Sequence, residues 1–245
     1  MFFVALSLVF FSCSEQPKQQ KKVVSVTCDS IPIKASADAT ADTEYMEYLA
    51  PTKAFVDKEM KIIIGYAADS MWVGGNECPM LNWATDALYE AAKAYYAPNK
   101  VDVAIVNMGS MRKPWPKGEI TLGKIFKLMP FDNKMVLLRL KGTYLMELCD
   151  SFAQHGGQGV AGMRVHIKGK KVVDVTVDGQ PVDTNAYYIV ATNNYLAGGK
   201  DYMEALTHYE EMIETPLLIR DIYREAVEAK DTIHAAVDGR MLIEP

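Results

Sequence analysis

Residues 101–120 read VDVAIVNMGSMRKPWPKGEI. The run at 101–106, apolar except for Asp102, predicts a buried strand, because nearly continuous apolar runs of this length are typical of strands covered on both faces. An amide (Asn107), two small residues, Arg112 and a turn rich in proline and glycine follow it directly. An arginine just past a strand end, where small residues let the backbone come close, indicates a ligand site at the edge of a sheet.

The segments on either side predict interleaved helices and strands. Apolar residues at helical spacing predict helices over 43–60, 79–96, 121–129, 143–154 and 216–229. Apolar and β-branched runs predict strands over 61–67, 101–107, 134–142 and 186–193, and the ending at 233–243 can include another. A hairpin is expected over 162–179, turning at Gly169, which can adopt a positive φ. Because the hairpin breaks a strict βαβ alternation, we expect an α+β fold with a mixed sheet layered with helices.

The N-terminus has the pattern of an export signal. The run MFFVALSLVFFSC is apolar and is followed at once by the polar SEQPKQQKK. A run this short fits the h-region of a signal peptide and is too short to span a bilayer. Ser12 before Cys13 resembles the lipobox of bacterial lipoproteins, in which Cys13 would carry the lipid, although Phe10 replaces the usual leucine. An ordinary cleaved signal peptide or a buried N-terminal segment is the alternative.

These patterns divide the chain into three parts. We expect a signal peptide with a lipobox at 1–13, a polar tether at 14–40 and one globular domain at 41–245. The tether can include a short strand near 23–27. The expected location is the cell envelope of a bacterium, on the periplasmic side or at the cell surface, with a lipid anchor in the membrane.

Charge and cysteine usage narrow the function classes. The net charge of −5 gives no basic field, so nucleic acid is not an expected partner. The cysteines at 28, 78 and 149 match no CxxC or zinc spacing, and we assign them no role.

The sequence carries no recognisable catalytic set. Its four histidines, at 155, 166, 208 and 234, include no pair at i,i+3 or i,i+4 and lie in no metal motif. A G-x-S-x-G elbow, a P-loop and a Rossmann fingerprint are also missing. The glycine-rich HGGQGVAG at 155–162 follows a predicted helix instead of opening one. We therefore expect no catalytic residue, metal ligand or cofactor in this chain.

Several motifs, in order, resemble the C-terminal, substrate-binding domain of the 5′-nucleotidases from about Ile62 to Met241. The family's N-x-G-G-I-R motif falls on NMGSMR at 107–112, its P-F-G-N motif on PFDN at 130–133, and its N-[FY]-L-A-x-G-G-D-G motif on 194–202. HGGQGVAG is similar to the family's SGG-x-x-Q-x-S-G loop. The family's N-L-x-x-D-A helix motif resembles Asn82, Trp83, Asp86 and Ala87.

The resemblance implies a role for each matched residue. Asn107 and Arg112 would contact the nucleoside and phosphate side of the ligand, Phe131 and Tyr195 would stack on its base, and Asn133 would contact the base edge. Asp201 would also contact the ligand, and Gly109 would let the backbone approach closely. These residue types suit the roles, since aromatic stacking on a base contributes about 1–3 kcal/mol. An arginine fork also suits phosphate.

Some positions depart from the family pattern. Lys200 and Tyr202 stand where the family has glycines, so their side chains are expected to narrow the pocket. Ser110 and Met111 replace a glycine and an isoleucine. Glu77 lies before the helix at 79–96, where the family places arginines, which puts a phosphorylated ligand in question.

In full-length members a separate N-terminal metallophosphatase domain performs the hydrolysis with two metal ions. Its D-x-H, G-N-H-E/D and G-H-x-H motifs do not occur in this sequence. The resemblance therefore implies the nucleotide- or nucleoside-recognition half of a split 5′-nucleotidase in nucleotide catabolism, with the metals in a separate metallophosphatase chain. The alternative is a non-catalytic lipoprotein that binds nucleosides or other small molecules. A third option is an adaptor that only docks a partner.

Overall fold

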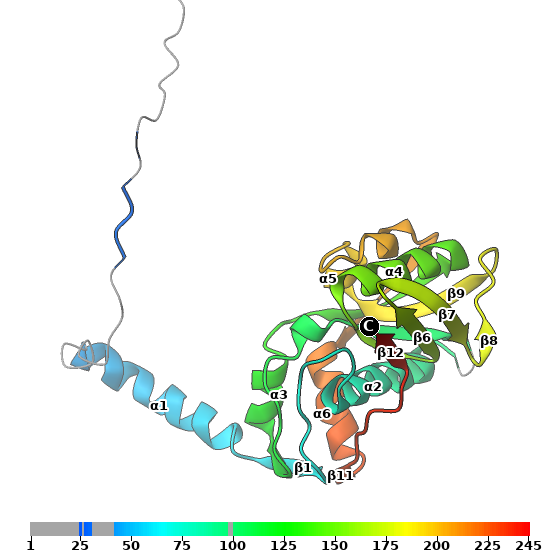
Figure 1. Cartoon of the computed structure of the whole chain (residues 1–245). Helices are drawn as coiled ribbons and strands as arrows, with labels where there is room; N and C mark the ends of the chain where they lie inside the picture. Colours follow the sequence, from blue (N-terminus) through cyan, green and yellow to red (C-terminus); the bar gives the residue numbers. More distant parts are fainter. Residues whose placement is uncertain (1–24, 26, 31–41, 98–99) are drawn as a thin grey trace, which may run out of the picture. The chain divides into compact units, whose positions relative to one another are not determined.

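The computed structural model describes residue 25 and residues 27–30, 42–97 and 100–245 (Figure 1). The expected signal peptide, the lipidation site Cys13 and most of the tether and of the strand at 23–27 lie outside these residues. The chain divides into two units, Met1–Tyr48 and Leu49–Pro245. The boundary falls inside helix α1 (Thr43–Glu59), which buries none of its residues. Among the described residues, no helix combines the length and the apolar character needed to cross a membrane.

The second unit is built on a mixed five-stranded sheet. Its order is β10 (Glu211–Leu218), β4 (Lys134–Lys141), β9 (Tyr187–Asn193), β2 (Val103–Val106) and β5 (Gly159–Ala161). Strands β2 and β9 run parallel, and the other neighbours run antiparallel. The mixed sheet and α+β class expected from the sequence are therefore confirmed.

The strand directions bring five connections to one edge of this sheet. Strands β2, β9 and β10 end at that edge, whereas β4 and β5 begin there, because Leu218 pairs with Lys134 and Val106 pairs with Gly159. Adjacent strands lie about 4.8 Å apart, so residues at the ends of β4 and β2, on either side of β9, are separated by about 10 Å. Side chains far apart in sequence therefore meet at this edge.

Helices cover both faces of the sheet. They are α2 (Pro79–Tyr95), α3 (Leu122–Leu128), α4 (Gly142–His155), α5 (Asn194–Ala197) and α6 (Ile219–Glu228), with 3₁₀ turns η2 (Met108–Ser110) and η3 (Glu204–His208). Alternate residues of β2 belong to two cores: Ala104 and Val106 pack with α2 and α6, and Val103 and Ile105 pack with α4. This alternation is the period of two that a strand imposes. Figure 1 shows α4 and α2 on opposite sides of β9.

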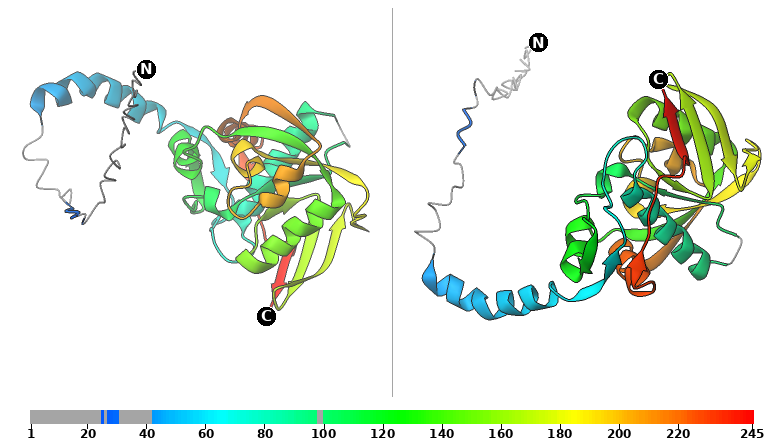
Figure 2. Two further views of the ribbon diagram at one scale, coloured as in Figure 1. Left: turned by 90° about the horizontal axis from the view of Figure 1, so that it is seen from above. Right: turned by 60° about the horizontal axis from the view of Figure 1, so that its bottom comes forward.

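Two smaller sheets complete the unit. One has the order β11 (Thr232–Ile233), β1 (Ile63–Ala67), β3 (Gly118–Thr121), and the other β12 (Met241–Glu244), β6 (Met163–Lys168), β7 (Lys171–Val177), β8 (Gln180–Pro181). Figure 2 shows β12, at the C-terminus, beside the hairpin of β6 and β7. That hairpin turns where expected, with Gly169 at φ 53° and Lys170 at φ 63°.

The element predictions hold with one correction at a boundary. The helix predicted over 216–229 begins only at Ile219, because the preceding residues complete strand β10. Leu218 pairs with Lys134, and the ladder shifts register between Glu214 and Leu218 around Pro216. The strands β3, β5, β8, β10 and β11 and the short helix α5 were not predicted.

Candidate functional site

A pocket of about 330 Å³ opens at the shared edge of the five-stranded sheet. The structure brings to it all seven ligand-site residues named from the sequence, together with Ser110. The lining residues are Asn107, Gly109, Ser110, Arg112, Phe131, Asn133, Tyr195 and Asp201.

The ends of three adjacent strands place the lining residues. Asn107 follows β2, Asn133 precedes β4, and Tyr195 follows β9 on the short helix α5. The Asn193 side chain accepts from the backbone N–H of Leu196 (3.0 Å), which caps α5 and fixes the turn that carries Tyr195. The pocket is thus assembled by strand pairing between segments far apart in the sequence.

Asp201 links two sides of the pocket. One carboxylate oxygen accepts a hydrogen bond from the Asn107 side-chain amide, and the other accepts from the Tyr195 hydroxyl (3.0 Å). The hydrogen bond to Asp201 raises the pKa of the Tyr195 phenol above its ordinary value. Tyr195 therefore keeps its proton, and keeps donating to the carboxylate, to a higher pH than an ordinary tyrosine.

Gly109 packs closely against two other residues of the pocket. A Cβ atom at this position would lie 3.3 Å from Oδ2 of Asp201 and 3.5 Å from Nδ2 of Asn107. A side chain larger than alanine would therefore push on the hydrogen bond that joins these two residues.

Asn107 presents an unused acceptor. Its side chain is almost fully buried, yet in the described part of the chain Oδ1 has no hydrogen-bond partner. Buried polar atoms are nearly always paired in folded proteins. Asn107 lines the pocket, so a donor supplied by a ligand can satisfy this atom.

Arg112 and Phe131 form the cationic and aromatic side of the pocket. The guanidinium carbon of Arg112 lies 5.3 Å from the centroid of the Phe131 ring. Phe131 also packs against the core, and its ring is half-buried. The backbone N–H of Arg112 donates to the carbonyl of Leu128 (3.2 Å), which holds the arginine near the end of α3.

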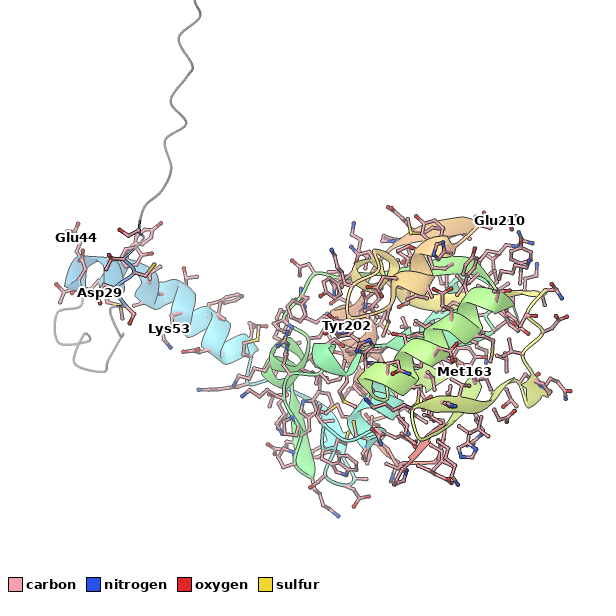
Figure 3. All side chains as sticks on the ribbon, turned by 45° about the horizontal axis from the view of Figure 1, so that its top comes forward. Asp29, Glu44, Lys53, Met163, Tyr202 and Glu210 are labelled. Atoms are coloured by element: carbon pink, nitrogen blue, oxygen red, sulfur yellow. The ribbon has the colours of Figure 1, made fainter. Side chains whose placement is uncertain are left out.

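Lys200 and Tyr202 do not line the pocket, so the expected narrowing is wrong. The Tyr202 ring, labelled in Figure 3, stacks on His155, with ring centroids 3.8 Å apart and planes 5° from parallel. Asp201 and Tyr202 both adopt left-handed backbone conformations, at φ 56° and 62°. This turn sends the Tyr202 side chain toward α4 while Asp201 faces the pocket.

Glu77 has a structural role that the sequence did not reveal. Its carboxylate accepts from Nδ2 of Asn82 (2.7 Å) and from the backbone N–H groups of Asp238 (3.0 Å) and Gly239 (3.1 Å). It therefore ties the start of α2 to the segment before β12. The helix-motif residues Asn82, Trp83, Asp86 and Ala87 line a separate cavity of about 630 Å³ beside α6.

Two further residues support the pocket and were missed. Oε1 of Gln158, before β5, accepts from the backbone N–H of Met108 (2.7 Å) and so fixes the turn after β2. Arg220, at the start of α6, bonds to the segment that carries Phe131. Gln158 lies in the glycine-rich stretch at 155–162, but the sequence did not single it out as a pocket residue. No sequence pattern indicated a role for Arg220.

The described residues contain no group of three or more His, Cys, Asp or Glu side chains arranged to hold a metal ion. The histidines lie apart: His155 stacks on Tyr202, and His208 stacks on Tyr144 with ring centroids 4.4 Å apart. The pocket can bind and orient a ligand through one cation, aromatic rings and hydrogen-bonding groups.

Comparison with known proteins agrees with this arrangement of fold and pocket. A family model described as "5'-nucleotidase, C-terminal domain" matches residues 63–208. The chain therefore belongs to the 5′-nucleotidase C-terminal domain family.

Named relatives are similar over part of their length. The NAD 5'-nucleotidase of Haemophilus influenzae is 27% identical over 191 residues, which are 67% of this chain and 31% of that protein. A probable 5'-nucleotidase of Treponema pallidum is 33% identical over 130 residues, covering 45% of this chain and 22% of its own length. This chain thus spans less than half the length of either relative.

Solved structures share the fold. The 5'-nucleotidase precursor from Thermus thermophilus superposes with a TM-score of 0.71 at 24% identity, over 82% of this chain and 42% of that one. The NAD nucleotidase of Haemophilus influenzae superposes with a TM-score of 0.65 at 21% identity, over 83% and 42%.

Proposed function

We propose that this chain is the substrate-recognition half of a split 5′-nucleotidase and that the pocket at the sheet edge binds a nucleotide. One observation carries the proposal: a single pocket collects an arginine, two aromatic rings, two side-chain amides and one carboxylate. Membership of the 5′-nucleotidase C-terminal domain family and relatives named as nucleotidases support it.

Each lining residue suits one part of a nucleotide. Arg112 offers a planar fork of donors for phosphate oxygens. Phe131 and Tyr195 offer ring faces for a base, and Tyr195 is 43% exposed, so its ring is accessible. Asn133 offers both a donor and an acceptor to a base edge, while Asn107 and Asp201 offer acceptors to ligand donors.

The hydrolytic step is assigned to a partner. We propose that a separate metallophosphatase chain holds the divalent metals, because this sequence lacks the family's D-x-H, G-N-H-E/D and G-H-x-H motifs. This chain would hold the nucleotide and present its phosphate to the partner, without a cofactor of its own. The apolar run before Cys13 supports export and a lipid anchor in the cell envelope.

The test is calorimetric titration of the chain with AMP, adenosine and UDP-glucose, repeated on Arg112→Ala. AMP should bind more tightly than adenosine, and Arg112→Ala should remove that advantage, about tenfold or more if one charge-assisted contact is lost. Lys113→Ala is the matched control, because Lys113 is an exposed neighbouring cation outside the pocket. Absence of binding for all three ligands would contradict the proposal.

A second candidate is a non-catalytic protein that captures nucleosides. One observation favours it: among the described residues, Arg112 is the only cationic side chain that lines the pocket. Glu77, where the family pattern has arginine, is already engaged by three donors. Equal affinity for adenosine and AMP, with no effect of Arg112→Ala, would select this candidate.

A further inference from the structure

The start of helix α6 holds the segment that carries two pocket residues. The backbone N–H of Ile219 donates to the carbonyl of Asn133 (2.9 Å). From the next residue, Nη2 of Arg220 donates to Oδ1 of Asp132 (2.6 Å), and Nη1 reaches the carbonyl of Phe131 (3.5 Å). Three consecutive residues of the Phe131 segment are therefore bonded to two consecutive residues of α6.

Arg220 is itself fixed in direction. Its side chain is only 14% exposed, and its guanidinium carbon lies 4.5 Å from the centroid of the Phe126 ring. A guanidinium packed on a ring has a defined plane, so its N–H groups point in set directions. Arg220 therefore holds the Phe131 segment at a defined position relative to α3 and α6.

The ion pair between Arg220 and Asp132 by itself contributes little to the free energy of unfolding. The Asp132 side chain is 79% exposed, so water screens the ion pair. Neither residue lines the pocket. The bonds to this segment instead fix the backbone from which the Phe131 ring enters the pocket.

We propose that Arg220 is a positioning residue for base recognition. It holds the Phe131 ring in the plane in which a nucleobase stacks, and Asp132 anchors the guanidinium to that segment. This inference rests on the proposed nucleotide-binding function and adds a determinant that acts on the base without touching the ligand.

The test compares a ligand that has a base with one that lacks it. The full chain is titrated with AMP and with ribose 5-phosphate, as wild type and as Arg220→Ala. We expect Arg220→Ala to weaken AMP binding roughly 5- to 150-fold, the equivalent of one lost stacking contact. Ribose 5-phosphate binding should weaken much less than AMP binding, because this ligand has no base to stack on Phe131 and is affected only through the packing of Arg112 on that ring.

Three variants separate positioning from a general structural effect. Arg224→Ala removes a partly exposed arginine one turn further along α6 and should change neither affinity. Arg220→Lys keeps the charge but not the fork, so AMP affinity should fall between wild type and Arg220→Ala. Asp132→Ala removes the carboxylate that anchors the guanidinium and should weaken AMP binding in the same direction as Arg220→Ala, but by less, because the bond to the Phe131 carbonyl remains.

The outcomes are distinct. Unchanged AMP binding in Arg220→Ala, or equal weakening of AMP and ribose 5-phosphate, would overturn the positioning role while leaving the proposed function in place. Failure of the wild-type chain to bind AMP would overturn the proposed function and this inference together.

Discussion

The side-chain amide of Asn107 donates a hydrogen bond to the carboxylate of Asp201, 94 residues further along the chain. The second carboxylate oxygen accepts from Tyr195, so one side chain joins the end of β2 to the turn after β9. Because Asp201 is bonded to both Asn107 and Tyr195, the three side chains hold one another in place on the polar side of the pocket.

Replacing Asp201 should disconnect this arrangement. Asp201→Ala leaves the buried Asn107 amide without its acceptor and releases the exposed Tyr195 hydroxyl, and loss of a buried partner costs about 1–3 kcal/mol. We expect AMP affinity in calorimetry to fall by roughly 5- to 150-fold on that scale. Asp174→Ala, at an exposed position on β7, serves as the control. Unchanged AMP affinity in Asp201→Ala would show that the link does not support the site.

The same bond predicts how Tyr195 titrates. Its pKa is raised by the hydrogen bond to Asp201, so the interaction is fully present below the ordinary tyrosine pKa. It is lost as the pH rises through the raised value. NMR of ¹³Cζ-labelled tyrosine should show Tyr195 titrating later than a free tyrosine, and Asp201→Asn should move its pKa back down. A Tyr195 pKa that ignores Asp201→Asn would contradict the bond.

Substitutions at Tyr202 can separate the effect of backbone strain on stability from the effect of ring stacking. Its left-handed conformation favours glycine, whereas its ring stacks on His155. Both Tyr202→Ala and Tyr202→Gly lose the stack, but only glycine relieves the backbone, by about 1 kcal/mol. Urea unfolding should therefore find Tyr202→Gly the more stable of the two.

Lys170 provides the comparison for that experiment. It adopts φ 63° in the hairpin between β6 and β7. Lys170→Gly should exceed Lys170→Ala in stability by a similar amount. A glycine advantage at Lys170 without one at Tyr202 would mean that the turn after Gly199 relaxes when the ring is removed.

Glu77 should matter for stability. Glu77→Ala leaves three donors without their acceptor, and we expect a loss of about 1–3 kcal/mol in the free energy of unfolding. For a domain of this size each kcal/mol lowers Tm by about 2–4 °C. Differential scanning calorimetry against Glu119→Ala, an exposed glutamate on β3, checks the prediction. Equal Tm values for the two variants would show that Glu77 does not hold the segment before β12.

The three cysteines in the described residues are free and should differ in reactivity. Burial raises the pKa of the Cys149 thiol to about 12, and Cys78 is also buried, whereas Cys28 is exposed. Since the thiolate is the nucleophile, a thiol reagent at pH 8 should modify Cys28 in the native Cys13→Ser chain and spare the other two. Urea should make all three react. Rapid native labelling of Cys149 would contradict its burial.

The sequence predicted those features that strong local patterns encode. Buried runs such as 101–107 and the helix at 79–96 carry their own periodicity, and ordered motifs named the residues that now line one pocket. The short strands β3 and β5 were missed because three or four residues carry too little periodicity, and their pairing depends on distant partners. Pro216–Leu218 resemble a helix start locally, but pairing of β10 with β4 keeps them extended.

The site could be predicted as a set of residues but not as a geometry. Tyr202 was expected to narrow the pocket, because its chain position next to Asp201 gives no hint that its ring stacks on His155. Arg220 lies 88 residues from Asp132, and no local pattern couples them. Contacts of this kind are decided by tertiary packing.

The shared edge of the five-stranded sheet has a consequence for protein engineering. Strand pairing sets the spacing between the segments that carry Asn107, Asn133 and Tyr195. The distances between these positions therefore depend on the backbones of β2, β4 and β9 and not on which side chains stand there. Substituting the side chains at these three positions would therefore change which ligand is preferred without changing the sheet. Deleting any one of β2, β4 or β9 would displace all three positions at once. A fusion protein that uses this pocket must therefore contain the whole domain.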